Sequence, residues 1–251
     1  MDGDLAFALQ LADLADPMTL AGFRSELTVK TKADLTPVTE VDRAVERAIR
    51  DRVERDRPGE AVVGEEFGAE EGDVRWIVDP IDGTKNFVRA IPVYATLIAL
   101  ERDGELVLGV ASAPALGRRW WAARGAGAFA DGHPIRVSTT DRLEDAQLCF
   151  GGLNAWRHAG RLDAFLELAG RCKRTRGFGD FWMHMLVAEG GAEIAVEPDV
   201  SLWDLAAVKV IVEEAGGRFT NLAGEARADG GSAVSTNGLV HAAVLEVLGA
   251  T

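Results

Sequence analysis

The stretch Trp76–Thr84 constrains the fold of this chain more than any other part of its sequence. It reads Trp-Ile-Val-Asp-Pro-Ile-Asp-Gly-Thr, so three apolar residues typical of a buried strand run directly into two carboxylates. Carboxylates at the end of a buried strand repel one another unless a cation lies between them, and Mg²⁺ prefers oxygen ligands. We therefore predict a cation site at this strand end, and we expect Pro80 to stop further sheet pairing there. An Asp-Gly turn with a capping aspartate is the alternative.

Three other acidic residues stand where the same kind of site could use them. Glu65 follows the short apolar run 61–64, Asp204 lies at the head of a predicted helix, and Asp42 comes three residues after Thr39. Taken alone, each has an ordinary explanation: a solvated surface acid, a partner of the helix dipole and a capping residue. Their occurrence together with the first two aspartates favours one shared acidic site.

Hydrophobic periodicity divides the chain into helices and strands. It predicts helices over residues 4–23, 39–57, 161–170, 180–189, 202–215 and 239–248. It predicts strands over residues 61–64, 76–78, 92–101, 105–111, 119–123, 127–130, 147–150, 174–177, 192–196 and 232–236. Pro17 is expected to kink or divide the first helix, and residues 24–38 are expected to form a loop. Asp103-Gly104 is typical of a hairpin turn.

From about residue 145 onwards, strands and helices alternate, which is typical of an α/β arrangement. We predict an α/β (α+β) protein made of two halves. Residues 1–145 form an N-terminal α+β half that carries the metal-binding motifs. Residues 146–251 form a C-terminal α/β half that completes the active site.

Charge and composition exclude several classes of function. The chain has 27 Lys and Arg against 40 Asp and Glu, a net charge of −13, which disfavours a nucleic-acid groove. No run of eighteen apolar residues is present, so we expect no membrane span. Cys149 and Cys172 have no metal-type spacing and form no disulfide framework, and the first four residues are acidic, unlike a secretory signal. A cytoplasmic location is therefore expected.

An ordered set of motifs resembles the inositol monophosphatase family. The set consists of Thr39-Glu40-Val41-Asp42, Gly64-Glu65-Glu66, Asp79-Pro80-Ile81-Asp82-Gly83-Thr84, Trp203-Asp204 and Glu213-Glu214-Ala215-Gly216-Gly217. The resemblance covers nearly the whole chain. It implies a layered αβαβα sandwich and a Mg²⁺-dependent, lithium-sensitive phosphomonoesterase acting on a small phosphate monoester.

The resemblance also implies roles for individual residues. Metal ligands would be the side chains of Glu65, Asp79, Asp82 and Asp204 and the carbonyl of Ile81, holding two or three Mg²⁺ ions per site. Thr84 and Glu65 would orient and deprotonate the attacking water, and Asp42 would join the cluster through ordered water. Asp82, Gly83 and Thr84 would also contact the substrate. Two cations can clamp a phosphoryl group and lower the pKa of a bound water.

Four further stretches resemble the branch of this family that hydrolyses L-histidinol phosphate. They are Thr36-Pro37-Val38-Thr39, Lys85-Asn86-Phe87-Val88-Arg89, Arg118–Gly125 and Gly179-Asp180-Phe181. That substrate carries an ammonium group and an imidazole, so its site needs acids beyond the metal ligands. Asp180 and Glu197 are the candidates. Alternatively, Asp180 caps its helix and Glu197 is a solvated acid before Pro198.

Two other functions remain open. The same chemistry would serve inositol phosphate, a sugar phosphate or a nucleotide phosphate. A non-catalytic binding protein on the same fold is an alternative of another class, which the intact acidic set disfavours.

Members of this family are commonly dimers, so we expect a homodimer with Arg118–Trp121 at or near its interface. A basic-aromatic nucleic-acid patch is the alternative reading of this stretch. The four histidines have no ligand spacing and are expected to be structural or exposed: His133, His158, His184 and His241.

Overall fold

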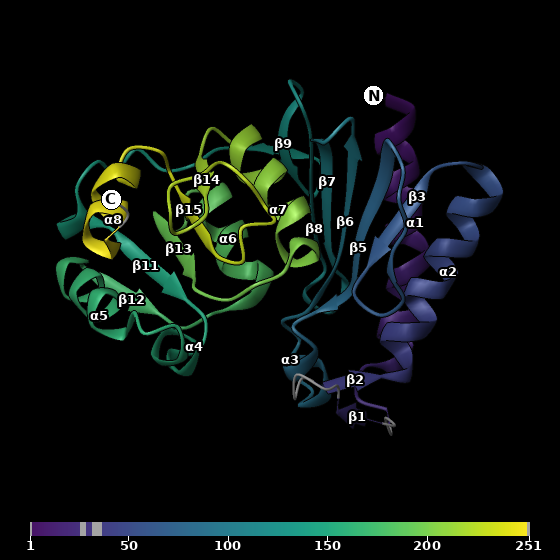
Figure 1. Ribbon diagram of the computed structural model, residues 1–251, viewed down its shortest axis with the longest axis horizontal. Coiled ribbons are helices and arrows are strands. Elements are labelled where there is room, and N and C mark those ends of the chain that lie inside the picture. The colour runs from purple at the N-terminus through teal and green to yellow at the C-terminus, as the bar shows by residue number, and fades with distance from the viewer. Residues whose placement is uncertain (1, 26–28, 32–36, 250–251) are drawn as a thin grey trace.

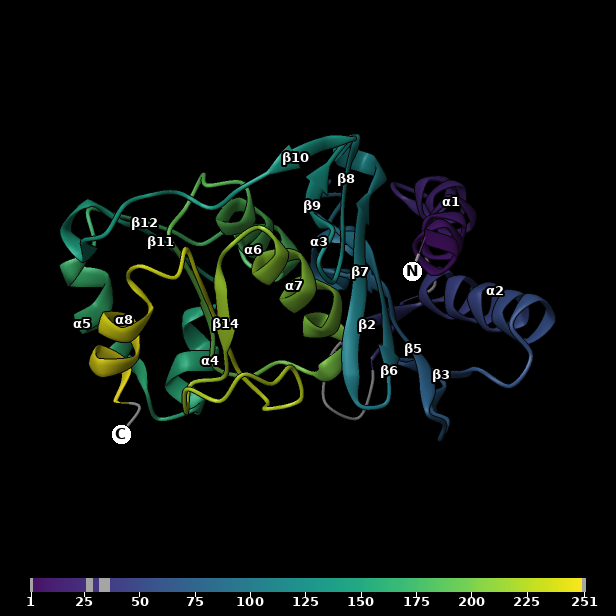
Figure 2. The ribbon, with the colours of Figure 1, turned by 90° about the horizontal axis from the view of Figure 1, so that it is seen from above.

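The computed structural model describes residues 2–25, 29–31 and 37–249. In the fold, two sheets alternate with three layers of helices, in the order helix, sheet, helix, sheet, helix (Figures 1 and 2). The helices are α1 (Asp2–Gly22), α2 (Glu40–Asp56), α3 (Thr84–Val88), α4 (Leu153–His158), α5 (Leu162–Arg171), α6 (Asp180–Ala188), α7 (Leu202–Glu214) and α8 (His241–Leu248). Two short 3-10 helices span Pro114–Leu116 and Leu143–Asp145. The expected layered αβαβα fold is confirmed.

The first sheet has eight strands in the order β10-β9-β8-β7-β6-β5-β3-β4. They are β3 (Ala61–Gly64), β4 (Gly68–Ala69), β5 (Val74–Asp82), β6 (Ala95–Arg102), β7 (Glu105–Ala113), β8 (Arg118–Ala123), β9 (Gly127–Ala130) and β10 (His133–Ile135). Neighbouring strands are antiparallel except β3 and β5, which are parallel. Asp103 and Gly104 both have positive φ and form the predicted turn between β6 and β7.

The second sheet has five strands in the order β12-β11-β13-β15-β14. They are β11 (Gln147–Phe150), β12 (Arg174–Arg176), β13 (Ile194–Glu197), β14 (Arg218–Thr220) and β15 (Ala233–Thr236). β11 is parallel to β12 and β13, whereas β15 is antiparallel to β13 and β14. The helices α6 and α7 lie between the two sheets, and α5 and α8 cover the far face of the second (Figure 2).

Two helices cover the outer face of the first sheet. In α2, Val45, Ile49 and Val53 are fully buried at helical spacing and share a core with α1. The helix α1 continues through Pro17, so the expectation that this residue would divide it is wrong. Pro17 has no N–H and so removes one hydrogen bond of the helix. It lies near the end of α1, which ends at Gly22, so the loss affects only the last part of the helix.

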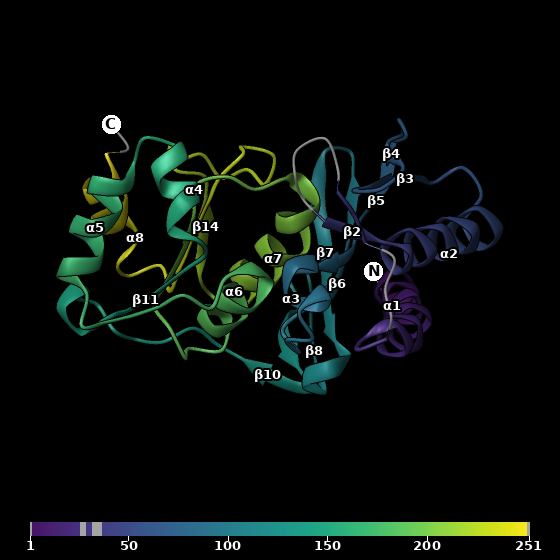
Figure 3. The ribbon, with the colours of Figure 1, turned by 90° about the horizontal axis from the view of Figure 1, so that it is seen from below.

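Part of the segment 24–38, which was expected to be a loop, forms strands. β1 (Val29–Thr31) and β2 (Pro37–Thr39) form a two-stranded antiparallel ribbon within it, and β2 lies beside α3 (Figures 1 and 3). Three-residue strands carry too short a pattern for periodicity to detect. Thr36, one residue of the motif shared with the histidinol phosphate branch, lies outside the described residues.

The helix α7 packs unusually close to the first sheet. A Cβ built on Gly109 of β7 would lie 2.4 Å from the backbone oxygen of Ala207 in α7, so no larger residue fits there. From Leu205 to Val212, every residue of α7 except Lys209 is buried. This close contact fixes the N-terminus of α7, and with it Asp204, relative to the strands.

The expectation that Pro80 stops sheet pairing in β5 is wrong. Sheet pairing does not stop there: β5 pairs with β6 up to Asp79, breaks at a bulge and pairs again between Asp82 and Ala95. The missing N–H of Pro80 is accommodated inside the bulge. The Thr96 hydroxyl donates to the carbonyl of Pro80 at 2.8 Å. The bulge places both aspartates at one end of the strand.

Candidate active site

A cavity of about 660 Å³ brings the acidic motifs together. Nine of the ten predicted site residues line it: Glu65, Asp79, Ile81, Asp82, Gly83, Thr84, Asp180, Glu197 and Asp204. They come from the ends of β3, β5 and β13 and from the beginnings of α3, α6 and α7. The tenth, Asp42, lies behind Thr84 and touches it.

The parallel pairing of β3 with β5 explains why two separate motifs meet. Gly64 is opposite Val78 in this pairing, so the next residues along the two strands, Glu65 and Asp79, emerge at the same edge of the sheet. Burial is the main cause of the raised pKa of Asp79, and the charge of Glu65 is the next.

Three aspartates form a group of ligands suited to a metal ion. Oxygen atoms of Asp79, Asp82 and Asp204, one from each, all lie within 4.8 Å of one another. Burial, followed by neighbouring negative charges, raises the pKa of Asp79 and Asp82 well above the usual range, and burial raises that of Asp204 to about 6. Clustered buried carboxylates of this kind are stabilised in their charged form by a bound cation, so the donor set fits a hard divalent ion.

The bulge in β5 is held by its own aspartate. Asp79 Oδ1 accepts a hydrogen bond from the backbone N–H of Ile81 at 2.9 Å. The same bulge turns the Ile81 carbonyl towards Thr84, whose hydroxyl donates to it at 3.0 Å. Gly83 has φ +84°, a conformation that favours glycine, and it starts α3 directly after the aspartates.

Thr84 has two acceptors for its single hydroxyl proton. Its Oγ1 lies 3.0 Å from the Ile81 carbonyl and 3.4 Å from Asp42 Oδ1. The other oxygen of Asp42 accepts from the backbone N–H of Thr39 at 2.8 Å and from the Thr39 hydroxyl, completing a capping box on α2. Burial is the main cause of the raised pKa of Asp42. The capping reading of Asp42 is therefore confirmed, and its place in the acidic cluster through ordered water stays a prediction.

Asp180 does not cap its helix. Gly179 precedes α6 without a side-chain cap, and Asp180, at φ +50°, instead accepts a hydrogen bond from Asn86 Nδ2 at 2.7 Å. Burial raises its pKa to about 6, and the positive charge of Lys85 opposes this rise. The N–H of the next residue, Phe181, donates to Asp82 Oδ2 at 2.6 Å, which ties the start of α6 to the metal-type cluster.

Glu197 ends β13 and is largely enclosed rather than solvated. Its side chain is 16% exposed, and its Oε2 lies 3.3 Å from His184 Nε2. Burial, followed by the charges of Asp180 and Asp204, raises its pKa well above the usual range. Glu197 and Asp180 therefore form a second group of carboxylates in the same cavity.

Sequence reasoning missed three residues of the cavity region. His184 is buried between Ser235 Oγ, 2.8 Å from its Nδ1, and Glu197, and burial lowers its pKa to about 3. Asn86, which donates to Asp180, also donates to the Val93 carbonyl at 3.0 Å, and this second bond fixes its amide group. Lys85 lines the cavity. Lys85 and Asn86 lie in a quoted motif, but only the fold brings Asn86 to Asp180, 94 residues away.

The other histidines and both cysteines lie apart from this chemistry. His133 and His158 are exposed, and His241 is buried between two threonine hydroxyls. Cys149 and Cys172 are free, and burial raises the pKa of each thiol to about 11.

The stretch Arg118–Trp121 is engaged within its own chain. Arg118 pairs with Asp131 and Glu189, and Arg119 pairs with Asp13 and Asp16. Trp120 is fully buried, and Trp121 stacks on Phe129 with ring centroids 6.1 Å apart. This leaves the expected dimer interface as a prediction.

Known proteins resemble this chain over almost its full length. The model of the inositol monophosphatase family matches residues 2–250. A histidinol-phosphatase of Mycobacterium tuberculosis is 54% identical and covers 98% of both chains; one of Streptomyces coelicolor is 48% identical and covers 98% of this chain and 96% of its own. The solved structure of a Thermotoga maritima IMPase superposes with a TM-score of 0.91 at 34% identity, covering 99% of this chain and 97% of its own. No helix among the described residues is long and apolar enough to cross a lipid bilayer.

Proposed function

The chain belongs to the inositol monophosphatase family, and we propose that it hydrolyses L-histidinol phosphate to L-histidinol and inorganic phosphate with bound Mg²⁺. The observation that carries the proposal is the pair of carboxylate groups in one cavity. One group, Asp79, Asp82 and Asp204, suits a divalent cation. The other, Asp180 and Glu197, lies close enough to raise the pKa of Asp82 and suits an organic cation. The relatives named histidinol-phosphatase support this assignment.

The metal would be held by the acids at the strand ends. Glu65, Asp79, Asp82 and Asp204, with the Ile81 carbonyl, are the proposed ligands of two or three Mg²⁺ ions. When bound, Mg²⁺ neutralises the phosphate oxygens and lowers the pKa of a water molecule. The protein residues then supply position and proton transfer.

Thr84 is suited to orient the attacking water. Because its hydroxyl proton is donated to the Ile81 carbonyl or to Asp42, its lone pairs are left to accept a hydrogen bond from that water. Glu65, on the neighbouring strand end, takes the proton. The water oxygen bonds to phosphorus, the bond from phosphorus to the histidinol oxygen breaks, and that oxygen gains a proton equivalent to the one that Glu65 accepted, so that Glu65 ends the cycle unprotonated.

Asp180 and Glu197 would recognise the ammonium and imidazole of the substrate. Asn86 and His184 support the two carboxylates from behind. An ester that carries only hydroxyl groups would leave Glu197 without a positively charged partner and Asp180 with the charge of Lys85 alone, at a cost typical of buried charges.

Phosphate release from a panel of esters with added Mg²⁺ tests the proposal. We expect histidinol phosphate to give the highest kcat/KM, with inositol, sugar and nucleotide monophosphates well below it. A preference for inositol phosphate would identify the second candidate, which the fold shared with the Thermotoga maritima IMPase favours. No release from any ester would point to a binding protein.

We also propose that the protein is a cytoplasmic homodimer with Arg118–Trp121 at or near the interface. Sedimentation at micromolar concentration should give twice the chain mass of 26.8 kDa. A monomer would contradict the proposed assembly.

A further inference from the structure

We propose that Glu46 is a positioning residue, which acts with Arg50 to hold Glu65 in place for metal binding. The inference rests on the metal site of the proposed function and is independent of which phosphate ester is hydrolysed. Glu46 lies on α2, one turn beyond Asp42, and its side chain is fully buried.

Both oxygens of the Glu46 carboxylate are already engaged by the protein. Oε2 accepts from the backbone N–H of Glu66 at 2.7 Å, and Oε1 accepts from the N–H of Phe67 at 3.2 Å. Arg50 Nε donates to Oε1 at 2.9 Å. Glu46 therefore binds the backbone just beyond Glu65 and acts through it.

The backbone just before Glu65 is packed against the same carboxylate. A Cβ built on Gly64 would lie 2.1 Å from Glu46 Oε1 and 2.3 Å from its carboxyl carbon. Only glycine fits this close approach. Glu65 thus lies between a residue packed on Glu46 and a residue hydrogen-bonded to it, so its backbone is fixed on both sides.

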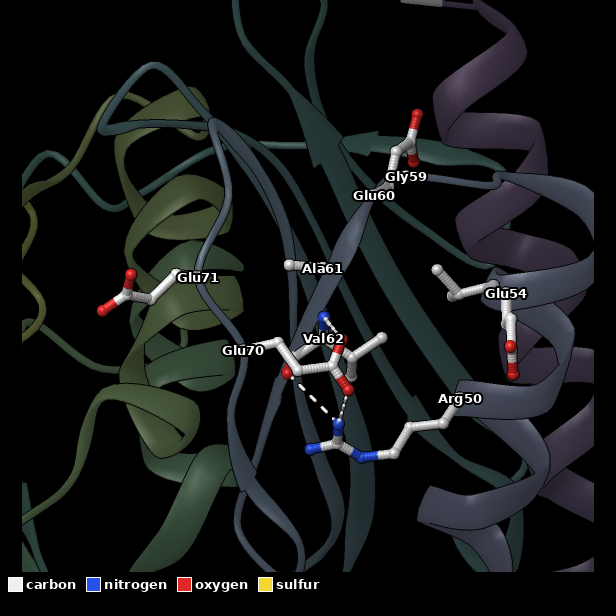
Figure 4. A pocket seen from close by; sticks show the side chains of 9 residues that line it. Arg50, Glu54, Gly59, Glu60, Ala61, Val62, Glu70 and Glu71 are labelled. Carbon is white, nitrogen blue, oxygen red and sulfur yellow. Dashed lines mark hydrogen bonds and ion pairs between the residues drawn. The ribbon is translucent and has the colours of Figure 1, made fainter.

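The contacts of Glu46 on both sides of Glu65 form a clamp, and Arg50 extends this clamp to the outer side of the hairpin formed by β3 and β4. Its guanidinium donates to the carbonyls of Val62 and Gly68 at 3.2 and 2.5 Å. It also pairs with Glu70 at 2.7 Å, as Figure 4 shows beside an open cavity of about 380 Å³. Glu70 in turn accepts from the N–H of Val62 at 3.2 Å. Arg50 therefore ties both strands of the hairpin to α2.

This clamp matters for metal binding because Glu65 belongs to a crowded group of negative charges. Glu65 lines the same cavity as Asp79, Asp82 and Asp204, so four carboxylates share one site. Carboxylates brought together repel one another, so the backbone of Glu65 has to be held in place against that repulsion. Residues that hold metal ligands from behind commonly change metal affinity by 10- to 100-fold when mutated.

Calorimetric titration with Mg²⁺, supported by the Mg²⁺-induced shift in Tm, tests the inference without an activity readout. In Glu46→Gln one amide NH₂ replaces an acceptor, so at least one of the three donors loses its partner. We expect the Kd for Mg²⁺ to rise about 10-fold. At saturating Mg²⁺, kcat should return to near the wild-type value, because the reacting groups are intact.

Glu214→Gln is the matched control. Glu214 also accepts from two backbone N–H groups of a hairpin turn, those of Gly125 and Gly127, both at 2.9 Å, but it lies away from the cavity. Its Kd for Mg²⁺ should be unchanged. An unchanged Kd in Glu46→Gln, or an equal rise in both variants, would overturn the inference.

Two further measurements keep the outcomes distinct. If Glu46→Gln does not fold, Arg50→Gln keeps the carboxylate and its two backbone N–H donors, and it removes the outer arms of the clamp together with the bond from Arg50 Nε to Glu46 Oε1. A raised Kd in this variant supports the inference, and an unchanged Kd rejects it. Wild-type protein that binds no Mg²⁺ would remove the proposed metal site itself, and the positioning role with it.

Discussion

Asp42 and Asp204 occupy the same position in two different helices, the third residue after the N-cap. Each accepts a hydrogen bond from the backbone N–H of its cap residue, Thr39 at 2.8 Å and Ser201 at 2.7 Å. Each also contributes to the acidic site: Asp42 contacts Thr84, and Asp204 completes the triad of aspartates. Capping fixes the side chain, so helix formation and site assembly depend on the same two residues.

The first prediction concerns the metal ligands. Asp79→Asn and Asp82→Asn should each lower kcat/KM by at least 10³-fold, because each removes a charged oxygen ligand from a divalent ion. A chelator should abolish wild-type activity, and added Mg²⁺ should restore it. The exposed Asp229 serves as control, since Asp229→Asn should leave phosphate release unchanged. Full activity in the chelator would end the metal hypothesis.

The second prediction concerns the hydroxyl of Thr84. Thr84→Ala should lower kcat by about 10²-fold and leave the Kd for Mg²⁺ nearly unchanged, because the hydroxyl orients the nucleophile. Thr84→Ser keeps the hydroxyl and should retain most of the activity. Steady-state kinetics and calorimetry on the two variants separate these effects. An equal loss in both would show that Thr84 has a structural role only.

The third prediction concerns recognition of the substrate amine. Asp180→Asn and Glu197→Gln should each raise KM for histidinol phosphate by about 10-fold or more, since a hydrogen bond to a charged group contributes about 1.5–3 kcal/mol. Hydrolysis of a small phosphomonoester without positive charge should change much less. Equal losses on both substrates would mean that these acids do not select the amine.

The fourth prediction concerns acid sensitivity at His241, which is remote from the cavity. Its ring accepts or donates two bonds, to Thr220 Oγ1 at 3.0 Å and Thr236 Oγ1 at 2.9 Å. Burial and then the charge of Arg218 lower its pKa to about 4, below the usual 6.5. The unfolded chain therefore binds more protons between these two pH values, and the free energy of unfolding rises with pH across that window.

Denaturant unfolding of wild type and His241→Gln from pH 7 to pH 4 measures this contribution. The stability advantage of wild type should shrink by on the order of 2 kcal/mol as the pH falls from about 6.5 to 4. The exposed His133→Gln, measured in the same way, is the control for replacing a histidine outside the core. A constant difference for His241→Gln would show that the ring is protonated in the folded protein as readily as in the unfolded chain.

Local pattern was sufficient for the longer elements. The predicted helices 39–57, 180–189 and 202–215 agree with α2, α6 and α7 to within one residue at each end. Several short elements were not predicted, among them β4, β14 and α3, because so few residues seldom establish a period. The sequence correctly predicted that Pro80 interrupts the pairing of its strand. It wrongly predicted that the pairing ends there, since β5 pairs with β6 again at Asp82.

The sequence by itself determined the candidate site residues that the fold brings into one cavity, because carboxylates at strand ends and helix starts are visible as local motifs. Only the tertiary structure decided which side chains support them. Asn86 contacts Asp180, 94 residues away, and His184 contacts Glu197, 13 residues away. Glu46 accepts a hydrogen bond from the backbone 20 residues further along the chain. Such contacts depend on how sheets and helices pack, and packing brings together residues whose separation in the chain follows no period.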